Sequence, residues 1–356
     1  MNLLFKVTNA NDPDNPLIGE TNIKEHYPYI HKNKQWNTTK PIVRQATTKF
    51  LIPFLGLEFY MMLADRYNQD SPTPNGPLDM LVLHLQDALA NYTIYNSLAK
   101  SNVQITDMGA QQQNSSEGTS APVNQWSYKA LRAQTSKDAD EFLDTALKLM
   151  ELEVAEGNAA FDLWKNSTAY DLKKGGLFRQ TIELDDYLNI QGSRRSFMAI
   201  QKYIIKAEVF YLEPILGSKL LKELRDYLKT TYSDTTAANL PMARLLKHAR
   251  RVAAEFGLFK AIPHLSILID ADGFKVSSAN DGFNEKKNVV SENQAALEAL
   301  KEAAEKDGKT YRATLIEFLH KNKTDYPTWL ESDYYISSQK NSNRKIHGSR
   351  NGAVMF

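Results

Sequence analysis

The sequence contains no cysteine among its 356 residues. Without thiols the chain forms no disulfides, thiolate nucleophiles, zinc–cysteine sites or iron–sulfur ligands. Long apolar runs are also lacking, because none approaches the ~20 residues that a membrane helix needs. The N-terminus has a short apolar patch without basic residues ahead of it, so we expect no secretory signal. These absences predict a soluble protein without membrane contact.

A strong charge of one sign is lacking as well. The chain has 43 Lys and Arg against 42 Asp and Glu, a formal net charge of +1. The overall balance therefore creates no long-range field that would recruit nucleic acid or an anionic membrane. The remaining composition is that of a globular protein, and the length suffices for two domains with separate cores.

Motifs that carry chemistry are scarce. No two of the seven histidines have the i, i+4 spacing of a helical metal pair, and we interpret His84 and His248 as packing residues. The stretch "DADG" at Asp270–Gly273 favours a hairpin turn over a calcium loop. No phosphate-binding loop, dinucleotide fingerprint, nucleophile elbow or HExxH is present. We therefore expect no catalytic residue, metal or cofactor, although a sequence does not reveal clusters formed in space.

The chain does contain an internal repeat. "FLIPFLG" ends at Gly56 and "YLEPILG" ends at Gly217. Pairing Pro53 with Pro214 gives an offset of 161 (214 − 53), which also pairs the two glycines. Self-similarity of this kind is the mark of a duplicated domain.

Further blocks match in the same order. An offset of 164 (248 − 84) pairs His84 with His248, and an offset of 165 (329 − 164) pairs Trp164 with Trp329 within a shared W-x-x-S-x-x-Y. An offset of 169 (307 − 138) relates the long helices that lie between these blocks. We therefore predict a tandem duplication, with copy 1 at 1–172, copy 2 at 173–338 and a C-terminal tail at 339–356.

Each copy predicts the same order of elements. Proline removes a backbone donor and glycine tolerates positive φ, so P-x-L-G indicates a helix–break–helix corner. Apolar helices are expected at about 78–100 and 241–261, each followed by alternation around a glycine that is typical of a β-hairpin. A long amphipathic helix and the tryptophan motif close each copy. The predicted fold is mainly α: two tandem copies of a small helical bundle, each with one β-hairpin.

Two features are candidate partner sites. No acidic residue follows Asp333. We predict that the C-terminal tail is a docking segment, and the alternative is a disordered terminus. The candidate docking residues are Lys340, Arg344, Lys345, Arg350, Val354 and Phe356. Exposed hairpins also pair readily with neighbouring strands. For contacts between subunits the candidates are Gln111, Gln112, Gln113, Phe274 and Lys275.

These motifs resemble a known group. The P-x-L-G corner, the "LADRY" or "ELRDY" helix after it, and the passage "ITDMGAQQQNSSEGTSAPVNQWSYKAL" are similar to an uncharacterised family from phage and prophage structural modules. Members of that family look like head-to-tail connector, or adaptor, proteins. The resemblance covers most of both copies.

The resemblance implies a non-enzymatic protein of the virion neck that is assembled in the host cytoplasm. It implies a homo-oligomeric ring, contacts with portal and tail or neck proteins, and passing contact with DNA in a lumen. A duplicated subunit departs from the usual single-domain adaptor, so the number of chains in such a ring stays open.

Two other functions stay open from the sequence. A tandem helical binding module would recognise a peptide or small ligand between the copies, and would be a stable monomer. An enzyme would gather titratable groups with perturbed pKa values in one pocket.

Overall fold

The computed structural model describes residues 3–5, 23–27, 36–69, 75–101, 103–106, 109–112, 125–170, 176–230, 240–265, 267–270, 273–276 and 290–339. Contacts among these residues form two compact units, unit 1 over residues 3–170 and unit 2 over residues 176–339. Each unit has its own hydrophobic core.

Over the residues that the structure describes, unit 1 is helical apart from one hairpin. Its elements are α1 (Ile23–His26), α2 (Trp36–Ala46), the π-helix η1 (Thr47–Leu51), α3 (Ile52–Leu55), α4 (Leu57–Tyr67), α5 (Gly76–Ser101), β1 (Val103–Thr106), β2 (Gly109–Gln112), α6 (Gln125–Ala155), the 3-10 helix η2 (Ala159–Phe161) and α7 (Asp162–Lys165).

Unit 2 repeats this order. Its elements are α8 (Thr181–Asp185), α9 (Arg194–Ala207), the π-helix η3 (Glu208–Leu212), α10 (Glu213–Thr230), α11 (Pro241–Ala261), β3 (Ile267–Asp270), β4 (Gly273–Val276), α12 (Val290–Lys321), the 3-10 helix η6 (Lys323–Asp325) and α13 (Pro327–Leu330). The predicted fold class, mainly α with two tandem copies, is confirmed.

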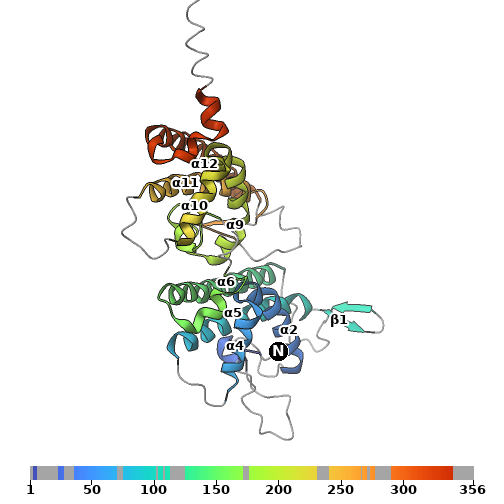
Figure 1. Cartoon of the computed structure of the whole chain (residues 1–356). Coiled ribbons are helices and arrows are strands. Elements are labelled where there is room, and N and C mark those ends of the chain that lie inside the picture. Colours follow the sequence, from blue (N-terminus) through green and yellow to red (C-terminus); the bar gives the residue numbers. More distant parts are fainter. Residues whose placement is uncertain are drawn as a thin grey trace, which may run out of the picture. The chain divides into compact units, whose positions relative to one another are not determined.

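The long helices form the body of each unit. Helix α5 packs along α6, and α11 packs along both α12 and α9 (Figure 1). In each unit a stacked pair of aromatic rings joins the π-helix to a long helix. The rings of Phe50 and Tyr92 stack at 4.0 Å, and those of Tyr211 and Phe256 stack at 3.8 Å. Stacked pairs of this kind add about 1 kcal/mol beyond the area that they bury.

The repeated proline explains the π-helix that precedes it. A proline within a helix lacks an N–H and its ring collides with the carbonyl four residues back. A π turn, which takes in one more residue, widens the backbone at this place. The amide of Ile52 accordingly donates to the carbonyl of Thr47, five residues back, and Glu213 donates to Glu208 in the same way.

The repeated glycine turns the chain. Gly56 has φ 76° and ψ 151°, and Gly217 has φ 77° and ψ 155°, a region that is essentially restricted to glycine. The helical stretch Thr38–Leu55 and the helix Leu57–Tyr67 meet there at 116°. The predicted helix–break–helix corner is therefore confirmed.

The tryptophan motif closes on this corner. The indole Nε1 of Trp164 donates to the carbonyl of Phe54 at 2.9 Å, and that of Trp329 donates to Ile215 at 2.9 Å. These carbonyls lie in the last turn of a helix, where no later amide can reach them. Both indoles are fully buried, so each satisfies a backbone group and fills space beside it.

The serine and tyrosine of W-x-x-S-x-x-Y complete the closure. Tyr170 lies against Trp164 and Tyr335 lies against Trp329, with ring centroids 4.8 and 4.9 Å apart. Ser167 lies beneath Gly56, where an added Cβ would come within 3.3 Å of it. The two motifs that define the repeat in the sequence are thus two halves of one contact, which we call the corner lock.

Both predicted hairpins are present. Strand β1 pairs antiparallel with β2, and β3 pairs antiparallel with β4 with Asp270 opposite Gly273. In the part of the chain that the structure describes, no single helix is long and apolar enough to cross a membrane, and only the bent pair at Gly56 meets that test when its two helices are counted together.

Substituting the corner glycines will destabilise their units. We expect Gly56→Ala and Gly217→Ala each to cost about 2 kcal/mol, because alanine is strained at this φ and ψ and its Cβ would meet Ser167 or Ser332. Urea unfolding followed by far-UV circular dichroism measures this cost. Gly157→Ala is the matched control, since φ is +79° there but no atom lies within 4 Å of an added Cβ. Equal effects at all three positions would contradict the packing part of this account.

Candidate functional site

Each unit begins with a short buried segment that is hydrogen-bonded to its long helix. We call residues 3–5 and 176–178 the lead-in segments. The carbonyl of Leu4 accepts from Nε2 of Gln86 at 2.5 Å, and the carbonyl of Leu177 accepts from Nε of Arg250 at 2.9 Å. Gln86 and Arg250 occupy matching positions in α5 and α11 (250 − 86 = 164). The lead-in segments are therefore equivalent parts of the two units.

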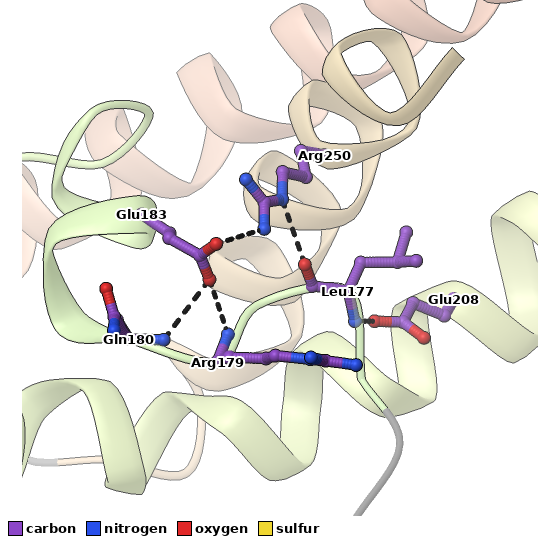
Figure 2. Close-up of polar contacts among 6 residues, drawn as sticks. All are labelled: Leu177, Arg179, Gln180, Glu183, Glu208 and Arg250. Atoms are coloured by element: carbon purple, nitrogen blue, oxygen red, sulfur yellow. Dashed lines mark hydrogen bonds and ion pairs between the residues drawn. The ribbon is translucent and has the colours of Figure 1, made fainter. Parts of the chain in front are cut away.

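A buried carboxylate holds the lead-in segment of unit 2 (Figure 2). Glu208, in η3, has a side chain with no exposed surface. Its Oε1 accepts from the amide of Leu177 at 2.8 Å. Its Oε2 lies 2.7 Å from Nη2 of Arg225, which is not drawn in the figure. Burial raises the pKa of Glu208, while Arg225 and the Leu177 amide oppose that rise.

A second ion pair lies on the other side of Leu177 (Figure 2). Glu183 Oε1 lies 2.5 Å from Nη2 of Arg250, and both side chains are largely buried. The other carboxylate oxygen of Glu183 accepts from the amides of Arg179 and Gln180, at 2.6 and 3.2 Å. These bonds fix the first turn of α8, where backbone amides have no helical partner.

Unit 1 uses neutral groups for the same task. Thr47 occupies the position of Glu208 (208 − 47 = 161). Its hydroxyl donates to the carbonyl of Val43 at 2.9 Å. The hydroxyl of Tyr60 hydrogen-bonds the side chain of Thr47 and the backbone of Leu4, and burial raises the pKa of Tyr60 to about 12. In both units the polar side chains near the π-helix therefore anchor the lead-in segment.

Sequence reasoning missed this anchor. Glu208 stands in "AEVFYLEP", an aromatic stretch in which a carboxylate is easily assigned to the solvated face. The available signal was the match of Glu208 to Thr47, a small residue within a buried stripe. Its partners Leu177 and Arg225 lie 31 and 17 residues away, so spacing on one helix gave no indication of them.

Helices α11 and α12 bring two carboxylates near each other. Burial, aided by the negative charge of Asp307, raises the pKa of Glu255 from 4.5 to about 7. Carboxylates with raised pKa values are common at functional sites and also occur in structural clusters. Within the described residues, no group of three or more His, Cys, Asp or Glu side chains has the arrangement of a metal site.

Unit 1 has a hollow beside its corner lock. It measures about 420 Å³ and is bounded by α4, the start of α5, η2 and α7. Its apolar lining includes Met62, Leu78 and Leu163, and its polar lining includes Glu58 and Asp162. The hollow has the size of a small ligand site or of a pocket for a few side chains of a partner.

The predicted partner residues fall largely outside the described part of the chain. All the tail residues named above, from Lys340 to Phe356, lie outside it, and so does Gln113. Gln111 and Gln112 lie in β2, opposite Gln104 and Val103, and Lys275 lies opposite Leu268. Of the hairpin residues proposed for contacts between subunits, only Phe274 has a described side chain.

Phe274 corrects the prediction of an exposed second hairpin. Its side chain is only 6% exposed and belongs to the core of unit 2. The outer edge of β4 is bonded within its own unit as well, since the amide of Phe274 donates to the carbonyl of Asn189 and the amide of Val276 donates to Ser196 Oγ. Phe274 is thus a core residue, and this edge does not offer a free strand.

The matched histidines differ in their surroundings. His248 stacks on Phe318 with ring centroids 4.4 Å apart, and burial lowers its pKa. This contact is the packing role expected from the sequence. His84 is half-buried in α5.

Removing Arg225, the ion-pair partner of Glu208, will destabilise unit 2, and the loss will be smaller at low pH. We expect Arg225→Met to cost about 2 kcal/mol at neutral pH, because it leaves a buried carboxylate without its cation. The pKa of Glu208 is already raised and rises further in this variant. A raised folded-state pKa gives stability that is present below the unfolded value, 4.5, and is lost as pH rises through the folded value. Urea unfolding between pH 4.5 and 8 should show this recovery at low pH. The Glu208→Gln/Arg225→Met variant lacks the titrating group, and an equal pH slope in that control would refute the assignment.

The raised pKa of Glu255 predicts a second pH dependence of stability. Its folded-state pKa of about 7 means that stability falls as pH rises from 4.5 through 7. We expect Glu255→Gln to raise the unfolding free energy by about 1 kcal/mol at pH 8 and to have little effect at pH 4.5. The gain at pH 8 is smaller than it would be for a fully buried carboxylate, because the Glu255 side chain is partly exposed. Asp307→Asn should give part of the gain. The exposed Glu302→Gln is the control, and a Glu255→Gln effect independent of pH would contradict the raised pKa.

Sequence comparison bears on the repeat directly. The profile of a family of unknown function, DUF6712, matches residues 51–174 and again residues 212–339. The matches begin 161 residues apart (212 − 51) and end 165 apart (339 − 174), the offsets that relate the two corners and the two closing tryptophans. No curated protein and no solved structure matches the chain. The two stretches cover more than half of the chain, which therefore belongs to the DUF6712 family of unknown function and carries its domain twice in tandem.

Proposed function

We propose that this chain is a non-enzymatic structural subunit that assembles through the surface of unit 1, as a head-to-tail connector ring in a virion neck. One observation carries the proposal. Large apolar side chains are exposed on unit 1 at positions where unit 2 exposes polar or cationic side chains.

The difference appears when the units are compared position by position. The offsets established above pair Leu57 with Ser218, Met61 with Lys222, Met80 with Arg244, Leu83 with Lys247, and Leu152 with Lys321. All ten residues are exposed. Leu83 and Leu152 each leave 55% of their surface accessible.

The comparison of the two units shows that the fold does not require apolar side chains at these positions. Because the two units share one fold, a solvated version of each position is compatible with it, as unit 2 demonstrates. Scattered exposed apolar residues are ordinary, but five on α4, α5 and α6 that are each replaced by a polar or cationic residue in the other copy favour a surface for protein contact. The apolar side chains of unit 1 therefore support a partner that covers them.

A protein partner suits this surface better than a small ligand does. The exposed side chains lie on the outer faces of helices, and contacts between permanent subunits are built from such apolar helical surfaces. The resemblance to connector proteins supplies the assembly: a ring in which every chain makes the same contact with the next. The part of the unit 2 surface that carries the five matching polar or cationic side chains would then face water or a more polar neighbour.

Quantitative mass spectrometry of particles sedimented from the source organism tests the proposal. We expect the chain in tailed particles at a fixed, small ratio to the portal subunit. The double variant Met61→Lys/Leu83→Lys, which copies unit 2, should fold and yet be lost from the particles, whereas Lys222→Met/Lys247→Leu should remain. Absence of the unmodified chain from particles, together with a stable monomer in solution, would instead favour a binding module.

A further inference from the structure

The hollow of unit 1 has a counterpart position in unit 2, and the two are occupied differently. Glu58 and Asn166, which line the hollow, match Lys219 and Glu331 (219 − 58 = 161; 331 − 166 = 165). In unit 2 these side chains bond to each other, with Lys219 Nζ 2.7 Å from Glu331 Oε2. The part of α10 that follows Gly217 is thereby joined to the residue before the serine of the tryptophan motif.

A second pair of positions repeats this difference. Met62 and Leu163 of the hollow match Glu223 and Thr328 (223 − 62 = 161; 328 − 163 = 165). The hydroxyl of Thr328 donates to Glu223 Oε1 at 2.8 Å. Unit 2 therefore has side-chain bridges at two of the matching places, where unit 1 presents two apolar side chains, a carboxylate and an amide to its hollow.

Two carboxylates line the hollow of unit 1. Glu58 and Asp162 form no ion pair with any cation among the residues that the structure describes. An apolar floor beside two carboxylates suits a segment that combines apolar with basic side chains. The lining of the hollow therefore indicates that its occupant carries both apolar and basic side chains.

One segment of this chain has that composition. Residues 340–356 contain four basic and no acidic residues, and they end in "AVMF". They follow Gln339, the last described residue of unit 2, and 17 residues (356 − 339) span at most ~60 Å when extended. We propose that the tail of one copy docks in the unit 1 hollow of a second copy.

This contact deepens the proposed function and rests on it. The tail follows unit 2 and the hollow lies in unit 1, so each copy offers a donor and an acceptor on different parts of its surface. Such a contact is heterologous and continues from chain to chain until a ring closes. Because it joins opposite charges near the surface, it weakens as salt is added.

Photo-crosslinking of the full chain identifies the occupant. Benzoylphenylalanine replaces Leu163, and the protein is mixed with an isotopically heavy copy before irradiation and mass spectrometry. We expect crosslinks from position 163 of one copy to residues 340–356 of the other. Crosslinks within one chain only, crosslinks to another segment, or their absence would each overturn the proposal.

Matched substitutions test the chemistry of the hollow. Glu58→Lys/Asn166→Glu installs the bridge of unit 2, and Lys219→Glu/Glu331→Asn removes that bridge from unit 2 as the control. In sedimentation velocity we expect the first variant to weaken self-association at least tenfold, with the control within twofold of the unmodified chain. Truncation after Gln339 should weaken it equally, and combining the truncation with the first variant should add nothing. Far-UV circular dichroism and thermal melting verify folding.

The outcomes separate this inference from the proposed function. Self-association that both the installed bridge and the truncation leave unchanged would overturn the tail contact, while incorporation into particles would still support a connector. A chain that stays monomeric at every concentration would also overturn the tail contact. Absence from particles bears on the connector alone, because the tail of one copy can bind the hollow of another without any virion.

Discussion

The indole–carbonyl hydrogen bond at the corner is the contact on which each unit depends. A helix that ends at Leu55 leaves carbonyls of its last turn without helical partners, and Trp164 supplies a donor to one of them across 110 residues of sequence. The bond fixes the direction in which α4 leaves the corner, and thereby the face that α4 presents to α5. The ring of the same side chain packs against that of Tyr170. Unit 2 repeats the arrangement with Trp329, across 114 residues.

The backbone devices were predictable because their causes are local. Pro53 fixes its own φ and restricts the residue before it, and Gly56 permits the positive φ of the turn, so the corner follows from three or four letters of sequence. The duplication was predictable because those letters recur with a constant offset. The pairing of the corner with the tryptophan motif was not, since nothing local to Trp164 indicates which carbonyl it will meet. The prediction that Phe274 lies in an exposed hairpin was wrong for a related reason. Alternation predicts a strand but does not indicate which edge of the strand the rest of the unit covers.

The two units also show how one fold holds its lead-in segment with different chemistry. Unit 2 uses Glu208 and Arg225, a buried charge that needs a cation, while unit 1 uses the hydroxyls of Thr47 and Tyr60. A neutral pair avoids the desolvation cost of an ion, whereas a charged pair is more demanding of geometry. Each unit thus serves as a reference for the other. A side chain that differs between them at one position reports on the surroundings of that position, because the fold itself is held constant.

The π-helices set a limit on how either copy can change in length. From Ala46 to Asp65 the two copies keep the single offset of 161, and differences in length begin only beyond that stretch. Loss of one residue from Thr47–Leu51 would convert the π turn to an α turn and rotate all of α2 by about 100°. Val43 and Ala46, now in the core, would then face water. Insertions and deletions are therefore confined to the loops, and the corner segment behaves as a part of fixed length in both halves of the gene.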